Sequence, residues 1–337
     1  MTRRFDMNSF RLVALAIIVI LVFSAACVSE PGASGSAMVP KPNYVHGYIN
    51  SKGEVVVPMT LDRADDFSEG LAFVMENNKG RYLNFNGGTA FQAPYADAGK
   101  FQQGLAGVLD QQKGWGFIDR QGTVVIGCRF TAVTGFDHNI AGASSGGKWG
   151  FIDNFGLFMI QPSFDMAREF RDGLAPVAKR TGWDNSQPVY SWGYVDAKGN
   201  MAIPFQFDDA HSFSGGLALV GKRVHAYKYN HGYINSNGTL AIPYQFMFAR
   251  DFTGSSQATV SAAVGNGEKW GVVDSSGKLI IAFSFAQEVD LSRSLNLFYK
   301  DGLFGYMDRD GKTVIPAQYD DAHQFSEGMA VVGKKVQ

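Results

Sequence analysis

The sequence has little cysteine, no strong charge imbalance and no apolar run long enough to span a membrane. Two cysteines among 337 residues exclude a disulfide-rich scaffold and a zinc site built from several thiolates. The net charge of −1 removes the electrostatic basis for nucleic acid as the main partner. These absences leave a globular chain whose 45% apolar residues are enough to bury a full core.

Recognisable catalytic and cofactor-binding motifs are also missing. The chain contains no complete Walker-type loop, no H-E-x-x-H and no C-x-x-C. Its six histidines are scattered without the spacing of metal ligands. The sequence therefore predicts no cofactor and no metal, and it favours a protein without catalytic activity. A propeller enzyme remains the alternative, because such an enzyme builds its site from residues spread over all its repeats.

The N-terminus has the layout of an export signal. Arginines precede an apolar run from Leu12 to Phe23, which is too short for a membrane-spanning helix of about 20 residues. The segment Ser24-Ala25-Ala26-Cys27 resembles the bacterial lipobox, in which the signal is cut before the cysteine and its thiol carries a diacylglycerol. Ser24 stands where leucine is usual. We predict a lipoprotein signal peptide at residues 1–26 and lipidation of Cys27.

Residues 27–44 are rich in Gly, Ser, Pro and Ala and predict a flexible tether. A coil of this length averages roughly 20–25 Å between its ends. The expected location is the bacterial cell envelope, in the periplasm or on the cell surface, with the membrane as partner through the diacylglycerol. Val28 is not Asp, which by analogy favours the outer membrane in a cell with two membranes. Cys128 falls at an apolar repeat position and is expected to be a buried small hydrophobe.

One sequence motif, which we call the repeat motif, occurs eight times after the tether. It consists of an aromatic-rich start, a glycine, two apolar residues, Asp or Asn, two variable residues and a glycine. In the second copy Arg81 stands where the first glycine is expected. All eight copies keep the Asx and the final glycine, at Asn50/Gly53, Asn84/Gly87, Asp119/Gly122, Asp153/Gly156, Asp196/Gly199, Asn235/Gly238, Asp274/Gly277 and Asp308/Gly311.

Each copy reads as three strands. The repeat motif itself predicts a strand followed by a hairpin turn, in which the Asx side chain accepts backbone N–H groups and the second glycine takes a positive φ. A second strand is expected to end at an Ile-Pro pair such as Ile203-Pro204, because proline interrupts the ladder. The third is a Leu-Ala-x-Val segment. Residues 45–337 thus form an all-β domain of eight β-hairpin or three-strand units.

The array opens on one strand type and closes on another, so its first and last strands lack partners. Pairing of residues 329–334 with residues 45–50 would satisfy both and remove two open edges. We therefore favour a propeller-like closed ring over an open β-superhelix, which would need capping units.

Four copies contain a Trp-Gly pair, at 115–116, 149–150, 192–193 and 270–271, and Lys148 and Lys269 precede two of them. Over residues 46–337 the chain resembles the WG-repeat family of bacterial proteins, also called KWG repeats. The resemblance implies a β-rich repeat body and does not imply an enzyme.

Two motifs place carboxylates beside a histidine, as a metal or acid/base site would require: Asp208-Asp209-Ala210-His211 and Asp320-Asp321-Ala322-His323. They lie three repeats apart, and Asp62 and Asp165 occupy the position of Asp208. We therefore interpret them as structural turns or caps. The Asx-x-x-Gly carboxylates lack the several ligands that a calcium loop needs within one loop, so they too are read as turns.

Loops in which the repeats differ are better candidates for binding. Two adjacent units carry extended hairpins, from Lys179 to Tyr190 and from Lys222 to His231, and these should lie side by side. Their aromatic and cationic side chains suit a sugar, an anionic polymer or a protein partner, and a merely solvated basic loop pair is the alternative. The candidate ligand-binding residues are Arg180, Trp183, Tyr190, Arg223, Tyr227 and Tyr229.

Two functions remain open. The first is a lipid-anchored extracytoplasmic binding or scaffolding module that recognises a protein or an envelope polymer through its loops. The second is a propeller-type enzyme that acts on polysaccharide or peptidoglycan with carboxylates near a central channel.

Overall fold

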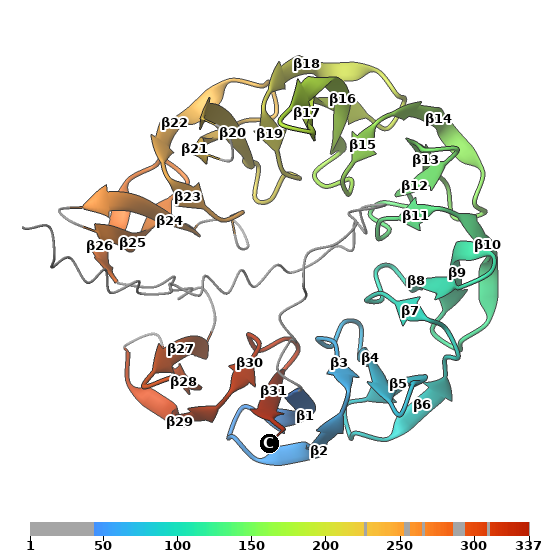
Figure 1. Ribbon diagram of the computed structural model, residues 1–337, viewed down its shortest axis with the longest axis vertical. Coiled ribbons are helices and arrows are strands. Elements are labelled where there is room, and N and C mark those ends of the chain that lie inside the picture. Colours follow the sequence, from blue (N-terminus) through green and yellow to red (C-terminus); the bar gives the residue numbers. More distant parts are fainter. Residues whose placement is uncertain are drawn as a thin grey trace, which may run out of the picture. The chain divides into compact units, whose positions relative to one another are not determined.

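The computed structural model describes residues 44–225, 228–252, 257–264, 267–285, 294–308 and 311–336. Within these ranges all regular elements are strands, and they form eight antiparallel sheets (Figure 1). The predicted signal peptide, Cys27, nearly all of the tether and Tyr227 lie outside the described residues. The all-β repeat prediction is confirmed.

The eight sheets follow one another along the chain. The first contains β2 (Val55–Leu61), β1 (Tyr44–Asn50), β31 (Met329–Lys335) and β30 (Asp321–Ala322). The second contains β3 (Arg63–Ala64), β4 (Leu71–Glu76), β5 (Lys79–Asn84) and β6 (Thr89–Gln92). The third contains β7 (Asp97–Ala98), β8 (Leu105–Asp110), β9 (Gly114–Asp119) and β10 (Val124–Phe130). The fourth contains β11 (Ala132–Val133), β12 (Ala141–Ser145), β13 (Lys148–Ile152) and β14 (Phe158–Phe164).

The remaining sheets repeat this order. The fifth contains β15 (Met166–Ala167), β16 (Leu174–Asp184), β17 (Gln187–Asp196) and β18 (Met201–Phe207). The sixth contains β19 (Asp209–Ala210), β20 (Ala218–His225), β21 (Lys228–Ile234) and β22 (Leu240–Phe246). The seventh contains β23 (Phe248–Ala249), β24 (Gln257–Val264), β25 (Gly267–Asp274) and β26 (Leu279–Phe285). The eighth contains β27 (Asn296–Lys300), β28 (Leu303–Met307) and β29 (Thr313–Tyr319).

The three predicted strands of each unit are present, and seven sheets have a fourth strand of two residues. This strand forms where the sequence indicated only a connection, around the Asp-x-Ala segment, and it pairs with the Leu-Ala-x-Val strand. It makes one edge of each of these sheets, which we call the short-strand edge, and the Ile-Pro strand makes the opposite edge (Figure 1). The fold is thus of the β-propeller-like type.

The first sheet is built from both ends of the array. Strand β1 pairs with β31 in an unbroken antiparallel register from Tyr44↔Lys335 to Asn50↔Met329. This is the pairing that the sequence predicts for residues 45–50 and 329–334. It gives each strand the partner that it lacks within its own repeat.

Aromatic residues hold neighbouring sheets together. In each of seven units an aromatic residue contacts a phenylalanine of the next unit at 4.7–5.1 Å between ring centroids. This aromatic residue follows the first glycine of the repeat motif, or Arg81 in the second unit. Five of these aromatics are buried tyrosines whose hydroxyl also donates to a backbone carbonyl 17 residues further on. The same contact therefore recurs from sheet to sheet, and it fixes neighbouring sheets in the same orientation.

The expectation that the Ile-Pro pair ends its strand is wrong. Strand β18 continues to Phe207, three residues beyond Pro204. Tyr194 pairs with Ile203 and Trp192 with Phe207, so three residues of β18 oppose one residue of β17, Gly193, in a bulge. Because β18 is an edge strand and Pro204 lies in the bulge, the missing N–H costs no ladder hydrogen bond.

The bulge explains why the first glycine of the repeat motif is required. A Cβ on Gly193 would lie 2.6 Å from the Ile203 carbonyl oxygen, and the equivalent glycines of six other units have backbone atoms equally close. The second unit departs from this pattern, because Arg81 pairs with Gln92 and Tyr82 with Phe91 in consecutive register, and the register shift of this ladder lies between Tyr82 and Leu83. The bulge opposite the glycine position is therefore absent. An arginine therefore fits where the other units require glycine.

Two smaller predictions can be compared with the structure. The Asx turns are confirmed: Asp196 Oδ1, for example, accepts the backbone N–H groups of Lys198 and Asn200, and Gly199 has a φ of 85°. Cys128, expected to be buried, is only half-buried and packs against the rim of a core cluster. Its strand, β10, is an edge strand, and this leaves one side open.

Candidate functional site

The two extended hairpins are present and come from neighbouring sheets. Strands β16 and β17 pair out to Asp184↔Gln187, and a turn with positive φ at Asn185 and Ser186 closes the hairpin. Strands β20 and β21 pair out to His225↔Lys228. Two strand ends therefore extend beyond the sheets side by side.

Trp183 and Arg180 make a stacked pair on the first hairpin. The Arg180 guanidinium carbon lies 4.9 Å from the centre of the Trp183 ring, a cation–π distance. Trp183 is 64% exposed, which is unusual for the largest apolar side chain. The exposed part of this ring and the adjacent positive charge form a surface that can receive a sugar ring or an anionic group.

An ion pair joins the two hairpins. The Arg223 guanidinium of the second hairpin lies 2.5 Å from an Asp184 carboxylate oxygen of the first. Both groups are partly shielded from solvent, so this contact is screened less than an ordinary surface pair. The prediction that the hairpins lie side by side is confirmed, and Arg223 acts as the link between them.

The tyrosines lie lower and support the arginines. Tyr190 pairs in register with Arg180, and Tyr229 pairs with Arg223. Tyr190 packs against the core cluster of the fifth and sixth sheets. Burial, followed by the nearby Asp209 carboxylate, raises the pKa of Tyr229. Both rings are half-buried and face a ligand less directly than Trp183 does.

Each hairpin rests on a capping carboxylate from its own repeat. Asp165 accepts the Arg180 backbone N–H at 2.9 Å, and Asp208 accepts that of Arg223 at 2.9 Å. Asp62 and Asp320 cap Asn77 and Lys335 in the same way. The structural interpretation of the Asp208 position is therefore confirmed.

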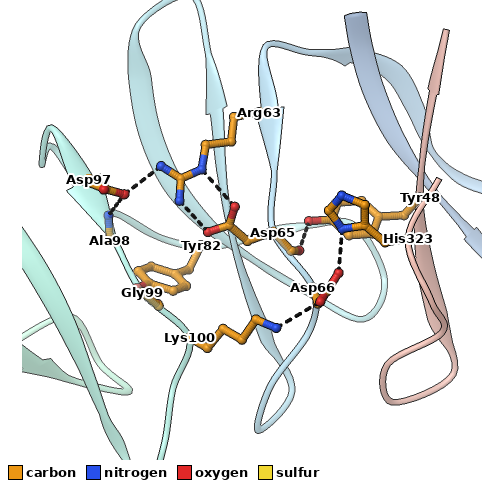
Figure 2. A network of polar contacts seen from close by, with 10 residues as sticks. All are labelled: Tyr48, Arg63, Asp65, Asp66, Tyr82, Asp97, Ala98, Gly99, Lys100 and His323. Carbon is orange, nitrogen blue, oxygen red and sulfur yellow. Dashed lines mark hydrogen bonds and ion pairs between the residues drawn. The ribbon is translucent and has the colours of Figure 1, made fainter. Parts of the chain in front are cut away.

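A second polar site follows the short-strand edges of the first three sheets (Figure 2). The Arg63 guanidinium makes a bidentate contact with Asp65, at 2.8 and 2.9 Å, and a further contact of 2.6 Å with Asp97 of the next sheet. These two carboxylates raise the pKa of Arg63 although burial alone would lower it. Burial raises the pKa of Asp65 in spite of the arginine.

Asp66 extends this network to His323 and Lys100. Its two oxygens lie 2.8 Å from His323 Nδ1 and 2.9 Å from Lys100 Nζ (Figure 2). Burial would raise the pKa of Asp66, but the histidine and the lysine outweigh it and hold the pKa well below its usual range. The pKa of His323 is raised in return, because Asp66 outweighs the effect of burial. The site thus connects the first, second and third sheets by charge.

A similar cluster spans the fifth, sixth and seventh sheets. Arg168 lies 3.0 Å from Asp209, and His211 contacts Asp209 at 3.5 Å and Asp251 at 2.9 Å. Burial alone would lower the pKa of His211, but its hydrogen bonds to these carboxylates raise it to about 9. The two Asp-Asp-Ala-His motifs therefore act locally, each binding a neighbouring repeat.

The sequence motif marked His211 and His323, but not their partners. Asp66 and Asp251 occupy the same position of their repeats, two residues after the alanine of the short strand, whereas Arg63 and Arg168 occupy two other positions. Only the packing of adjacent sheets brings these residues together. Among the described residues no group of three His, Cys, Asp or Glu side chains is placed to hold a metal ion. The chemistry of both short-strand clusters is ion pairing between sheets.

Comparisons with known proteins agree with the repeat fold. The family model described as "WG containing repeat" matches residues 47–79, 115–149, 149–183, 192–223, 232–256 and 304–335, more than half of the chain. A search of curated proteins finds no significant match. None of the residues that the structure describes forms a helix with the length and apolar character needed to cross a membrane.

Solved structures resemble the chain at low identity. The structure described as "the eukaryotic initiation factor" is 10% identical, with 84% of this chain and 87% of that chain covered and a TM-score of 0.52, and it supports the fold alone. BamB from Moraxella catarrhalis is 12% identical, with 87% and 88% covered and a TM-score of 0.42. An uncharacterised protein from Listeria monocytogenes is 11% identical, with 78% and 94% covered and a TM-score of 0.46.

Proposed function

This chain belongs to the family of WG containing repeat proteins, and from that premise we propose that it is a lipid-anchored, extracytoplasmic binding or scaffolding module. Its ligand is a component of the cell envelope, a polymer or a protein, that carries anionic or sugar groups. The extended hairpins of the fifth and sixth sheets bind this ligand, and the other sheets hold them in place.

One observation carries the assignment of the binding surface. The exposed Trp183 ring stacks with Arg180, and the Arg223–Asp184 ion pair fixes the neighbouring hairpin beside it. An aromatic ring with little freedom to move loses less entropy on binding than a mobile one. Aromatic and arginine side chains are also the residue types that dominate binding surfaces.

The binding surface is tested by cosedimentation with purified peptidoglycan sacculi. Trp183→Ser should bind at least about tenfold more weakly than the parent, since a central aromatic anchor is lost. Phe155→Ser is the matched control, because Phe155 is an 81% exposed aromatic in an Asx turn away from the hairpins. Equal binding by both variants would remove the hairpins from recognition of this polymer.

The anchor is supported by the basic start, the short apolar run and the Ser24-Ala25-Ala26-Cys27 segment. Cells grown with an alkyne-bearing fatty acid should incorporate the label into the parent and into Cys128→Ser, but not into Cys27→Ser. Label retained by Cys27→Ser, or absent from the parent, would contradict lipidation at this thiol.

A further inference from the structure

The chain enters the first sheet at the place where other sheets have a hairpin. Tyr44 pairs with Lys335 just as Tyr190 pairs with Arg180 and Tyr229 with Arg223. The Lys335 backbone N–H donates to Asp320, as those of the two arginines donate to Asp165 and Asp208. Strands β31 and β1 therefore occupy the position that a hairpin occupies in the fifth and sixth sheets. Residue 44 lies toward the end of the sheet where the hairpin tips lie in those sheets.

The hairpins of the packed neighbouring sheets point the same way. The repeated contact from a tyrosine hydroxyl to a carbonyl 17 residues on gives neighbouring sheets the same orientation, as at Tyr48 and Tyr194. We call the end of these sheets with the tips of the Leu-Ala-x-Val hairpins the hairpin end. Cys27 precedes Tyr44 by 17 positions, and the tether predicted from the sequence would span roughly 20–25 Å. An acyl chain on Cys27 would thus keep the hairpin end close to the membrane.

The two extended hairpins give this end a basic and aromatic surface. Lys179, Arg180, Lys222, Arg223 and Lys228 lie on them, and Asp184 is the acidic residue among the described part of both. Asp165 and Asp208, below them, are used as caps, and each is also within 3.7 Å of a lysine. Trp183 and Val224 are exposed beside these charges. Tryptophan with lysine and arginine is the composition found at the headgroup level of membranes.

The opposite end carries charges of both signs, with exposed lysines such as Lys198 and Lys278 in the Asx turns. The Asx turns there place Asp119, Asp153 and Asp196 at the surface, and each carboxylate accepts only backbone N–H groups of its own turn or a neighbouring amide. An anionic surface would therefore attract the hairpin end more strongly than this one, although the whole chain has a net charge of only −1.

We propose that the surface formed by Trp183, Lys179, Arg180, Lys222 and Lys228 binds the anionic headgroups of the membrane that carries Cys27. The inference rests on the proposed anchoring, and it gives the proposed binding surface lipid headgroups as its ligand in place of a polymer or a protein. The acyl group supplies attachment, and the hairpin surface supplies orientation. The Asx-turn end then faces away from the membrane.

The test uses a chain that carries no lipid, so that its result does not depend on acylation. The exported protein with Cys27→Ser is incubated with vesicles of phosphatidylcholine, with or without 30% phosphatidylglycerol, and bound protein is measured by flotation. We expect binding to the anionic vesicles only, with a loss of about tenfold or more between 50 and 500 mM NaCl as the charges are screened.

A hairpin variant and a matched control locate the surface. The triple substitution Trp183→Ser, Lys179→Glu and Lys228→Glu should bind at least about tenfold more weakly. The control removes one exposed aromatic and reverses two exposed lysines at the other end, by Phe155→Ser, Lys198→Glu and Lys278→Glu, and should bind like the parent. Thermal unfolding of both triples checks that the fold is kept.

Three results would overturn the inference: equal binding to neutral vesicles, equal weakening by the control, or no binding to anionic vesicles at low salt. Trp183-dependent binding to sacculi without vesicle binding would identify a polymer as the ligand. It would then leave the proposed function standing and remove only its lipid ligand. Failure of the fatty-acid label at Cys27 would instead remove the anchor and leave the vesicle result interpretable.

Discussion

At Gly193 the carbonyl of Ile203 lies so close that no side chain can be accommodated without movement of a backbone. The glycine is therefore required by the bulge in the neighbouring strand, and the tryptophan before it is not. Histidine and phenylalanine replace the tryptophan at His46 and Phe304, and in both copies the following glycine is retained. The reverse case is Arg81, where the bulge is absent and the glycine is absent with it.

Gly193→Ala should lower the free energy of unfolding by about 1–3 kcal/mol, because the added methyl group overpacks a backbone contact. Gly182→Ala is the control, since a Cβ there would meet nothing within 4 Å and the residue has no positive φ. Urea unfolding of the two variants measures the difference. Similar midpoints would mean that the bulge moves aside at little cost.

At the scale of strands and sheets, the ion clusters at the short-strand edges connect elements that the backbone ladders do not. Arg63 and Asp97 join the second and third sheets, and His211 and Asp251 join the sixth and seventh. Such pairs are only partly shielded, so their contribution depends on pH and salt.

Stability should therefore fall as the solution becomes alkaline. The pKa of His211 is raised to about 9 in the folded chain, against about 6.5 for a free histidine. Its contribution is complete below about pH 6.5 and is lost as the pH rises through about 9, because the unfolded state loses its proton first. The urea midpoint of the parent should drop between pH 6 and pH 9.5.

His211→Gln should show a smaller drop over the same pH range, and His225→Gln, at an exposed hairpin position, should show the drop of the parent. Equal drops in the parent and in His211→Gln would contradict the role given to this imidazolium. The carboxylate Asp209 acts in the opposite direction. Its pKa lies below its usual range, so its contribution is present above about pH 4 and is lost only in stronger acid.

Local chemistry explains what the sequence could predict. The Asx turns, the three main strands and the pairing of β1 with β31 follow from turn residues, alternation and the need to pair strand edges. The short strand was missed because two residues carry no periodicity. The prediction that Ile203-Pro204 ends its strand was wrong because the effect of the proline depends on its position at a bulge of an edge strand. Only the assembled sheet shows this position.

The binding surface was predictable in part. The insertions between repeats located both hairpins, and their adjacency follows from the order of the units. The cation–π stacking of Arg180 on Trp183 and the supporting position of Tyr190 were not predictable, because they depend on the twist and pairing of β16 and β17. Tyr227 lies outside the described residues.

At the scale of the whole molecule, β31 belongs to two core clusters at once. Met329 and Val331 pack toward the second sheet, and Ala330 and Val332 pack toward the eighth. The alternation of a strand thus places the seven-residue strand β31 between the earliest and the latest repeats of the array.

Deletion of residues 329–337 should lower the free energy of unfolding by roughly 5–9 kcal/mol, from the lost burial of Met329, Val331 and Val332 alone. It also leaves β1 and β30 without their partner. Deletion of residues 336–337 is the control and should change little. Thermal and urea unfolding compare the two, and a full-strength, cooperative transition in the longer deletion would show that the first sheet is dispensable.

Because β1 pairs with β31, some 280 residues later in the chain, β1 is synthesised long before the strand that completes its sheet. During that interval it has an unsatisfied backbone edge that any extended peptide could capture. A chaperone that covers this edge of β1 until β31 is available would therefore protect the chain from mispairing.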